Sequence, residues 1–291
     1  MKIAFGMIVF EGDYVLKQCL ESIYDVATQI LIAEGPVKYW QDRGRITSMD
    51  RTNDILDLFP DPEHKITIVH GQYSEKDDQC NAYMKHLRPD IDYLWNLDSD
   101  ELYKTEDIEQ LIKILERDKY TSVGVKSCSF YGGFDKYIGG FEEQTDNFLR
   151  VFRVTPGSTW LTHRPPTIKY PDSIIKSHLN SDQLYDMCGL RMYHYSYVFP
   201  RQVYNKISYY KSAVSMERCI DNYFKLVYLP WVKFPESRPL IENQFNGVHE
   251  FRPDFRPETR TKQFVDSHPD SIIKDLSILK QEFNSQLKEF V

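Results

Sequence analysis

Two aspartates, Asp98 and Asp100, directly follow an apolar run and have the residue types and spacing for metal chemistry. Residues 93–97 are typical of a buried strand, and this strand ends at the two carboxylates. Carboxylates at positions i and i+2 can face one small hard cation where the chain bends, and such oxygen ligands suit Mn²⁺ or Mg²⁺. Open α/β sheets bind ligands at the carboxyl ends of their strands, so this position favours a metal site over a solvated acidic turn.

The elements that must position these aspartates alternate along the first part of the chain. Apolar runs of strand length occupy residues 3–10, 29–33, 65–70 and 93–97. Helical spacing of apolar residues occupies residues 15–24, 50–59, 75–87 and 105–115. We expect Asp13 and Thr105 to cap the first and last of these helices. The alternation predicts an α/β fold with a mostly parallel sheet flanked by helices and right-handed crossovers.

The regular alternation of strands and helices ends in the second half of the chain. Strands are expected at residues 122–130, 148–154 and 191–198, and a helix begins at Pro200. Residues 230–257 hold many prolines and little periodicity, whereas residues 269–290 form an amphipathic helical tail. We therefore predict a domain at residues 1–225, with halves 1–120 and 121–225, followed by a C-terminal extension at residues 226–291.

Composition excludes some classes of protein. The 291 residues carry 36 basic and 43 acidic side chains and a net charge of −7, which argues against nucleic acid as a partner. The five cysteines are odd in number and lack Cys-x-x-Cys spacing, so we expect reduced thiols in a cytoplasmic protein. No apolar run approaches about 20 residues, so no transmembrane segment is expected.

Residues 3–215 resemble a family 2 type glycosyltransferase of the GT-A (Rossmann-like) fold, in its Asp-x-Asp-Glu subgroup. Asp98-Ser-Asp100-Glu101 matches the metal motif, and Glu34-Gly35 stands where the family has Asp-Gly. Further matches are Ser48-x-Asp50-x-Thr52, residues 74–79 before the metal strand, Arg150-Val-Phe-Arg, and Trp160-Leu-Thr-His163. The aromatic loop, a polar loop at residues 36–50 that holds Tyr39 and Trp40, is expected to lack structure of its own and interrupts the pattern. Arg164 stands where the subgroup has a glutamate.

The resemblance implies an enzyme that moves a sugar from a nucleotide-diphosphate sugar to an acceptor hydroxyl, with Mn²⁺ or Mg²⁺ as cofactor. A UDP-sugar is the first choice of donor, an inverting outcome is expected, and the acceptor is a glycan, a lipid or a protein. The resemblance assigns Asp98 and Asp100 to the metal. It assigns the residues that contact the donor as Glu11, Glu34, Lys76, Asp78 and Asp98.

The remaining roles are open in the sequence. A histidine is often a further metal ligand in such enzymes, and His194 is equally well explained as that ligand or as a structural histidine. An inverting reaction needs a group that accepts the acceptor's proton. Glu142 and His163 are the first candidates, together with Asp100 as a catalytic carboxylate; Glu143, Asp146 and Asp172 lie in the same half of the chain.

Two other functions fit parts of the pattern. A nucleotidyltransferase would need a glycine-rich basic loop after the first strand, and the acidic Glu11-Gly-Asp13 disfavours it. A non-catalytic sugar- or protein-binding module with a relict nucleotide or metal site would not respond to nucleotides or Mn²⁺.

Overall fold

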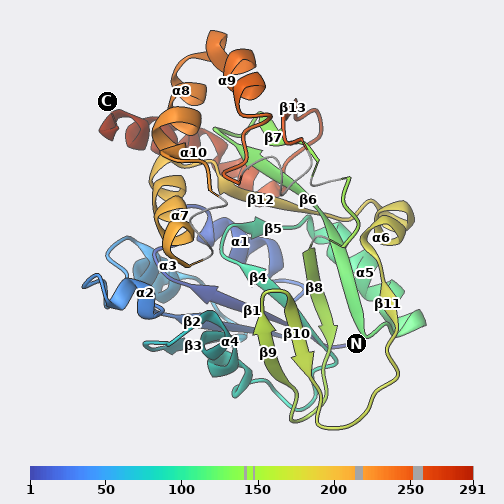
Figure 1. Cartoon of the computed structure of the whole chain (residues 1–291). Helices are drawn as coiled ribbons and strands as arrows, with labels where there is room; N and C mark the ends of the chain where they lie inside the picture. Colours follow the sequence, from blue (N-terminus) through green and yellow to red (C-terminus); the bar gives the residue numbers. More distant parts are fainter. Residues whose placement is uncertain (141–142, 147, 214–218, 252–257, 291) are drawn as a thin grey trace. The chain divides into compact units, whose positions relative to one another are not determined.

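The computed structural model describes residues 1–140, 143–146, 148–213, 219–251 and 258–290 (Figure 1). Its contacts divide the chain into two compact units, one formed by residues 1–126 and 145–192 and the other by residues 127–144 and 193–291. The chain passes between these units three times: within β6 (Ser122–Tyr131), between residues 144 and 145, and within β12 (Arg191–Tyr197). The predicted boundary near residue 225 stays a prediction.

The first unit is built on a sheet whose central part is parallel. Four parallel strands lie in the order β4-β1-β2-β3, and β8 (Phe148–Arg153) runs antiparallel to β4 and to the first half of β6. The four parallel strands are β1 (Ile3–Val9), β2 (Gln29–Glu34), β3 (Ile66–His70) and β4 (Tyr93–Asp98). Every residue of β1 and β2 is buried, as expected for central parallel strands with both faces covered.

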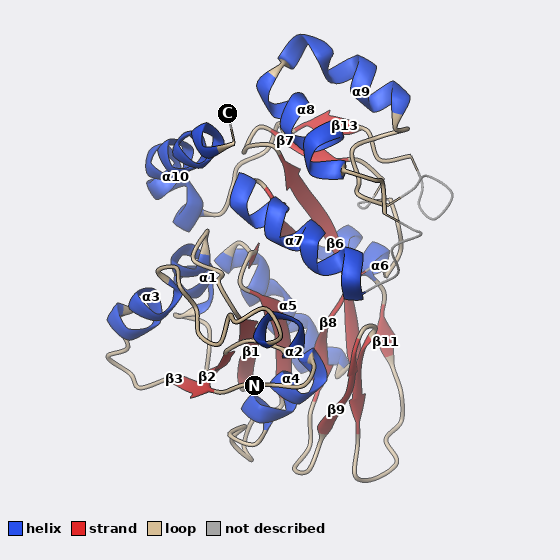
Figure 2. Ribbon diagram, turned by 60° about the vertical axis from the view of Figure 1, so that its left-hand side comes forward, coloured by secondary structure: helices blue, strands red, loops and turns tan. Residues whose placement is uncertain are grey.

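Helices of the first unit flank this sheet (Figure 2). They are α1 (Leu16–Ile23), α2 (Lys38–Gln41), α3 (Thr52–Leu58), α4 (Lys76–Met84), α5 (Thr105–Asp118) and α6 (Ser181–Cys188). A two-stranded hairpin, β9 (Thr159–His163) with β10 (Pro166–Lys169), packs on α4, where the Asn81 side chain exchanges two hydrogen bonds with the backbone of Trp160. Two short strands, β5 (Glu101–Leu102) and β11 (His178–Leu179), complete this unit.

Both predicted helix caps are wrong. The Asp13 side chain makes no cap bond; its Oδ2 accepts hydrogen bonds from the backbone and side chain of Arg51, so a long-range contact replaces the local one. Thr105 is already inside α5, after Lys104, and its hydroxyl donates to the carbonyl of Ser22. Both side chains that the local sequence assigns to helix caps are therefore hydrogen-bonded to residues far away in the sequence.

The second unit combines β7 (Lys136–Ile138), β13 (Thr261–Gln263) and parts of β6 and β12 with helices. The helices are α7 (Pro200–Ala213), the π-helix η2 (Phe224–Tyr228), α8 (Leu229–Lys233), the 3₁₀ turn η3 (Pro235–Ser237), α9 (Arg238–Gln244) and α10 (Asp270–Glu289). Neither α8 nor α9 was predicted from the sequence, because each is short and carries its proline in the first turn, where proline is tolerated.

Aromatic rings fill the core of this unit. Phe130 stacks on Tyr195 at 4.7 Å between ring centroids, and Phe264 and His268 close the group at 4.9 and 4.7 Å from Phe130. His268 is held by the Tyr195 hydroxyl at 2.7 Å and by the carbonyl of Phe134 at 3.0 Å. The high aromatic content of the sequence therefore serves packing in this part of the chain.

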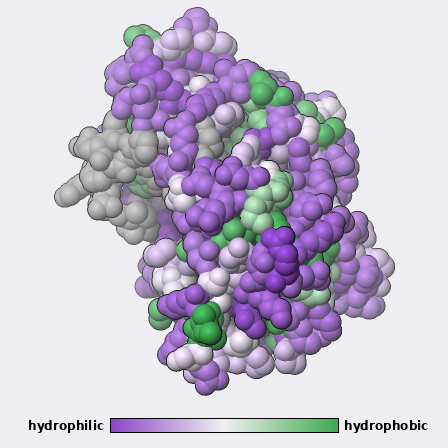
Figure 3. Space-filling view, turned by 90° about the vertical axis from the view of Figure 1, so that its right-hand side faces the viewer, coloured by the Kyte–Doolittle hydropathy of each residue, from purple (hydrophilic) through white to green (hydrophobic). Residues whose placement is uncertain are grey.

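On the face shown in Figure 3, hydrophilic residues predominate and hydrophobic residues form separate small patches. Among the helices in the described ranges, none combines the length and the apolar character needed to cross a bilayer. The predicted α/β fold, with a mostly parallel sheet flanked by helices and a helical tail, is confirmed.

Candidate active site

Three parallel strands of the first unit bring predicted site residues to one edge of the sheet. Val9 pairs with Glu34 across β1 and β2, and Ile8 pairs with Asp98 across β1 and β4. Glu11 follows closely after β1. Because parallel strands end at the same edge, Glu11, Glu34 and Asp98 gather at the carboxyl edge, where α/β sheets bind ligands.

The acidic turn after β4 concentrates negative charge. Asp98 ends the strand, Asp100 follows in the turn, and both side chains are half-buried. Burial, and then the charges of Glu101, Asp100 and Asp98, raise the pKa of the Cys19 thiol well above its usual value. The thiol lies directly at this turn, because it donates to the backbone carbonyl of Glu101 at 3.1 Å.

The donor set at this turn fits a hard divalent cation. Asp98 and Asp100 offer carboxylate oxygens, the ligand type that Mn²⁺ and Mg²⁺ take in proteins. Within the described ranges, no group of three or more His, Cys, Asp or Glu side chains is placed to hold a metal ion. A cation bound by the two aspartates would therefore need phosphate and water oxygens to complete its coordination.

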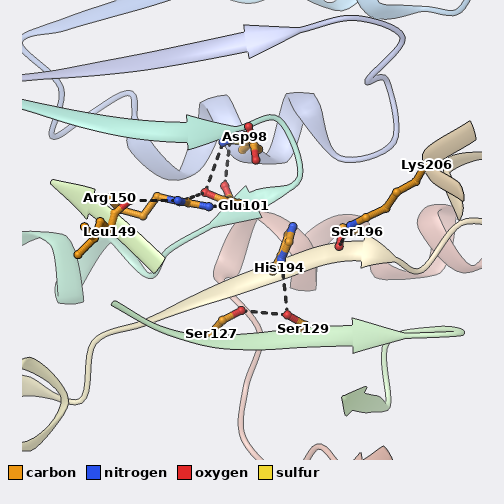
Figure 4. Close-up of polar contacts among 10 residues, drawn as sticks. Asp98, Glu101, Ser127, Ser129, Leu149, Arg150, His194, Ser196 and Lys206 are labelled. Atoms are coloured by element: carbon orange, nitrogen blue, oxygen red, sulfur yellow. Dashed lines mark hydrogen bonds and ion pairs between the residues drawn. The ribbon is translucent and has the colours of Figure 1, made fainter. Parts of the chain in front are cut away.

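Glu101, the last residue of the Asp98-Ser-Asp100-Glu101 motif, is fully buried. Its carboxylate receives two hydrogen bonds from the Arg150 guanidinium, Nε to Oε2 at 2.8 Å and Nη2 to Oε1 at 2.5 Å (Figure 4). The backbone N–H of Asp98 donates to the same Oε2 at 3.3 Å. Burial alone would lower the pKa of Arg150, but the Glu101 carboxylate outweighs it and raises that pKa, so the guanidinium keeps its positive charge.

Glu34 is the buried carboxylate at the end of β2. The Ser48 hydroxyl donates to its Oε1 at 2.7 Å, and His70 Nδ1 lies 3.1 Å from its Oε2. Ser48 also accepts from the backbone N–H of Glu11 at 3.0 Å. The Ser48–Thr52 segment thus returns to the strand ends in spite of the aromatic insertion, and Thr52 accepts from the N–H of Gly12 at 2.9 Å.

Glu11 is held by the aromatic loop. Arg45 forms an ion pair with its carboxylate, with Nε 3.0 Å from Oε1. The Arg45 guanidinium also lies over the Trp40 ring at 4.1 Å, and Trp40 contacts Phe10 at 6.1 Å between ring centroids. This loop was predicted to lack structure of its own, but α2 lies within it and its aromatic residues order it.

The start of α4 approaches the same edge. Lys76 is half-buried and Asp78 is exposed, both in the first turn of the helix. Gln79 is buried, and its Nε2 lies 2.9 Å from the carbonyl oxygen of Ala33, 3.2 Å from that of Gly35 and 3.3 Å from that of Val9. The amide of Gln79 therefore ties the ends of β1 and β2 to the helix.

His163 lies under this helix rather than in solvent. Its backbone N–H donates to Asp77, and its Nδ1 lies 3.7 Å from the sulfur of Cys80. Burial, aided by the positive charges of Lys76, Arg164 and Arg150, lowers the pKa of His163 to about 3, although Asp98 opposes the shift. A neutral imidazole with so low a pKa is a weak proton acceptor, so its burial disfavours the predicted role as base, which stays a prediction.

The other proton-acceptor candidates divide into three cases. Glu142 lies outside the described residues. Glu143 forms an ion pair with Lys262 at 2.7 Å, and Asp146 binds His178 Nε2 at 2.7 Å, so both carboxylates already have partners. Asp172 is exposed on the segment after β10.

His194 belongs to the second unit. It is half-buried on β12, and its Nδ1 lies 3.5 Å from the hydroxyl of Ser129, which is 3.0 Å from that of Ser127 (Figure 4). Further along, Lys206 donates to the Ser196 hydroxyl at 2.9 Å. The role of His194 as a metal ligand stays a prediction.

Several residues of this edge were not assigned a role from the sequence. Arg150, Ser48 and Gln79 stood within quoted motifs, so the motif match was the signal that could have found them. His70 had no such signal, because it simply ends a strand. Its position became meaningful only when β3 paired with β2.

A mostly parallel sheet with carboxylates gathered at its carboxyl edge is the arrangement with which open α/β proteins bind ligands. Residues 47–192, just over half of the chain, match Glycosyl transferase family 2. The chain belongs to this family. The predicted family, and with it the prediction of a glycosyltransferase at the level of the family, are confirmed.

None of the curated proteins compared with the chain matches it. Among solved structures, the chain is similar to S. aureus TarS 1-349 in complex with UDP-GlcNAc (12% identity, TM-score 0.35, 46% of this chain and 36% of that one). It is also similar to glucosyl-3-phosphoglycerate synthase from Mycobacterium tuberculosis in complex with Mn²⁺ and UDP-Glc (12%, 0.32, 45% and 43%). A third is 4-diphosphocytidyl-2C-methyl-D-erythritol synthase from Anaerococcus prevotii DSM 20548 (14%, 0.32, 52% and 71%).

These likenesses carry no argument about activity, because all three TM-scores are below 0.5. The chain spans less than half of the length of the first two structures.

Proposed function

We propose that this protein transfers a sugar from a nucleotide-diphosphate sugar to an acceptor hydroxyl, with a divalent cation bound at Asp98 and Asp100. The observation that carries the proposal is the acidic turn at the end of β4, held at the carboxyl edge of the sheet next to Glu34 and Glu11. Family membership supplies the class of reaction.

The donor would lie along the carboxyl edge. Glu34 stands where the family's carboxylate meets the base or ribose, and Ser48 and His70 hold both of its oxygens in place. Lys76 offers a positive charge at the start of α4, where the N-terminal end of the helix also favours anions.

Asp98 and Asp100 would hold the cation against the donor's diphosphate. A bound Mn²⁺ or Mg²⁺ would stabilise the negative charge that develops on the leaving diphosphate as the glycosidic bond breaks. Since two protein carboxylates are an incomplete coordination shell, metal and nucleotide should bind together, each strengthening the other. An acceptor hydroxyl of a glycan, lipid or protein then attacks the sugar, with inversion, and a carboxylate or imidazole takes its proton.

The test combines binding with turnover. UDP, GDP and CMP are titrated by calorimetry with and without Mn²⁺, and UDP-GlcNAc and UDP-Glc are assayed for metal-dependent release of UDP. We expect Asp100→Asn to abolish turnover with an unchanged circular dichroism spectrum, and the surface variant Asp118→Asn to keep it. Full activity of Asp100→Asn would refute the metal assignment, and no response to any nucleotide would favour a non-catalytic binding module.

A further inference from the structure

We infer that Glu101 and Arg150 are positioning residues for the proposed metal site: together they hold the backbone of the Asp98–Asp100 turn in the shape that binds a divalent cation. The inference rests on the proposed function. It assigns a role to a buried ion pair, and it makes the site depend on Arg150, which lies 49 positions after Glu101 in the chain.

The geometry of the turn is the first argument. Glu101 Oε2 accepts from the N–H of Asp98 and from Arg150 Nε, so one carboxylate oxygen joins the strand end to the guanidinium. Arg150 is itself fixed, because its Nη1 donates to the carbonyl of Leu149 at 3.0 Å. The backbone carbonyl of Glu101 accepts from the Cys19 thiol at 3.1 Å. Both ends of the acidic turn are therefore tied to buried groups.

The balance of charge is the second argument. Asp98, Asp100 and Glu101 bring three carboxylates into one short turn, and the buried guanidinium of Arg150 pairs with the last of them. Arg150 neutralises Glu101, so two negative charges remain at Asp98 and Asp100 for a cation of charge +2. Without Arg150, Glu101 would repel both aspartates and would compete with them for the cation.

Stability alone does not require such a pair. Replacing a buried ion pair by apolar residues of similar volume is often neutral or stabilising, whereas removing one partner leaves a buried charge without compensation. The double variant Glu101→Leu/Arg150→Met removes both charges together and also the acceptor for the Asp98 N–H. It therefore separates a positioning role from a role in stability.

The experiment measures binding of Mn²⁺ in the presence of UDP, by electron paramagnetic resonance, in the full chain. Loss of a group that orients a metal ligand typically weakens metal binding by about 10- to 100-fold, so we expect the Mn²⁺ Kd of the double variant to rise by at least about tenfold. Its melting temperature should stay near that of the wild type. Arg150→Lys keeps the charge but loses the two parallel N–H bonds, and should raise the Kd by about three- to tenfold.

A matched control is Leu111→Ala, which removes a buried side chain from α5 without touching the turn. It should lower the melting temperature and leave the Mn²⁺ Kd unchanged. A double variant or an Arg150→Lys variant that binds Mn²⁺ with wild-type affinity would overturn this inference and leave the proposed function intact. A wild-type chain that binds no Mn²⁺ with UDP, GDP or CMP would overturn the proposed function and this inference with it.

Discussion

Replacing Gln79 by leucine should weaken both the fold and the binding of the donor. The side chain is 3% exposed, and its amide nitrogen lies 2.9–3.3 Å from three carbonyl oxygens at the ends of β1 and β2. Leucine has nearly the same volume but no donor, so these carbonyls lose a shared partner. At about 1 kcal/mol for each lost hydrogen bond, the free energy of unfolding of the first unit should fall by about 2–3 kcal/mol.

A loss of this size corresponds to a fall of about 4–12 °C in the melting temperature for a unit of this length. Urea denaturation measures the free energy, and calorimetric titration measures the Kd for UDP with Mn²⁺. We expect the UDP Kd to rise several-fold, because the strand ends that carry Glu34 and Glu11 are no longer tied to α4.

Gln29→Leu is the matched control. Gln29 is also buried on β2 and makes two hydrogen bonds, to the carbonyl of His86 at 2.9 Å and from the N–H of Arg88 at 3.0 Å, at the opposite end of the strand. Gln29→Leu should lower the free energy of unfolding by a similar amount and leave the UDP Kd unchanged. The reasoning fails if the free energy of unfolding of Gln79→Leu is within about 0.5 kcal/mol of the wild-type value. It also fails if Gln79→Leu and Gln29→Leu weaken UDP binding equally.

Three further predictions test other contacts. First, the pKa of His163 is about 3 in the folded chain against 6.5 for the free group, so the unfolded state binds more protons between these pH values. The free energy of unfolding of the wild type should therefore fall as the pH drops from 6.5 to about 3. In His163→Gln it should fall less over the same range. Second, a Cβ at Gly12 would lie 2.6 Å from the Ser99 hydroxyl, so Gly12→Ala should weaken Mn²⁺ binding with UDP, and Gly12→Ala/Ser99→Ala should restore it. Third, His194→Ala should raise the Mn²⁺ Kd by about tenfold if this histidine is a ligand.

Each of these has an outcome that contradicts it. Equal pH dependence of urea denaturation in the wild type and His163→Gln would show that this imidazole is not held neutral. If Gly12→Ala/Ser99→Ala binds Mn²⁺ no more tightly than Gly12→Ala, the contact with Ser99 is not the cause of the weaker binding. An unchanged Mn²⁺ Kd in His194→Ala would favour the structural explanation of that histidine.

The order of elements in the first unit was readable from the sequence because each signal is local. Apolar runs of strand length such as residues 3–10 and 29–33, bounded by turn residues, are typical of buried strands, and Asp98 ends another such run at residues 93–97. The helix caps were mispredicted for the converse reason. Local sequence pairs the side chains of Asp13 and Thr105 with the backbone N–H groups of the helix that follows each of them. In the folded chain, Asp13 instead accepts from Arg51, and Thr105 donates to the carbonyl of Ser22.

From its sequence alone, this protein could be assigned to an α/β glycosyltransferase family with two aspartates at a strand end, since residue order and hydrophobic pattern are properties of neighbouring residues. The pairing of Glu101 with Arg150, the return of Ser48 to Glu34, and the amide of Gln79 beneath two strand ends were decided by tertiary structure. These contacts join residues 14 to 70 positions apart, and no local pattern encodes which distant polar group will be buried beside which. Burial makes each such group need a partner, and the packing of the sheet and α4 selects it.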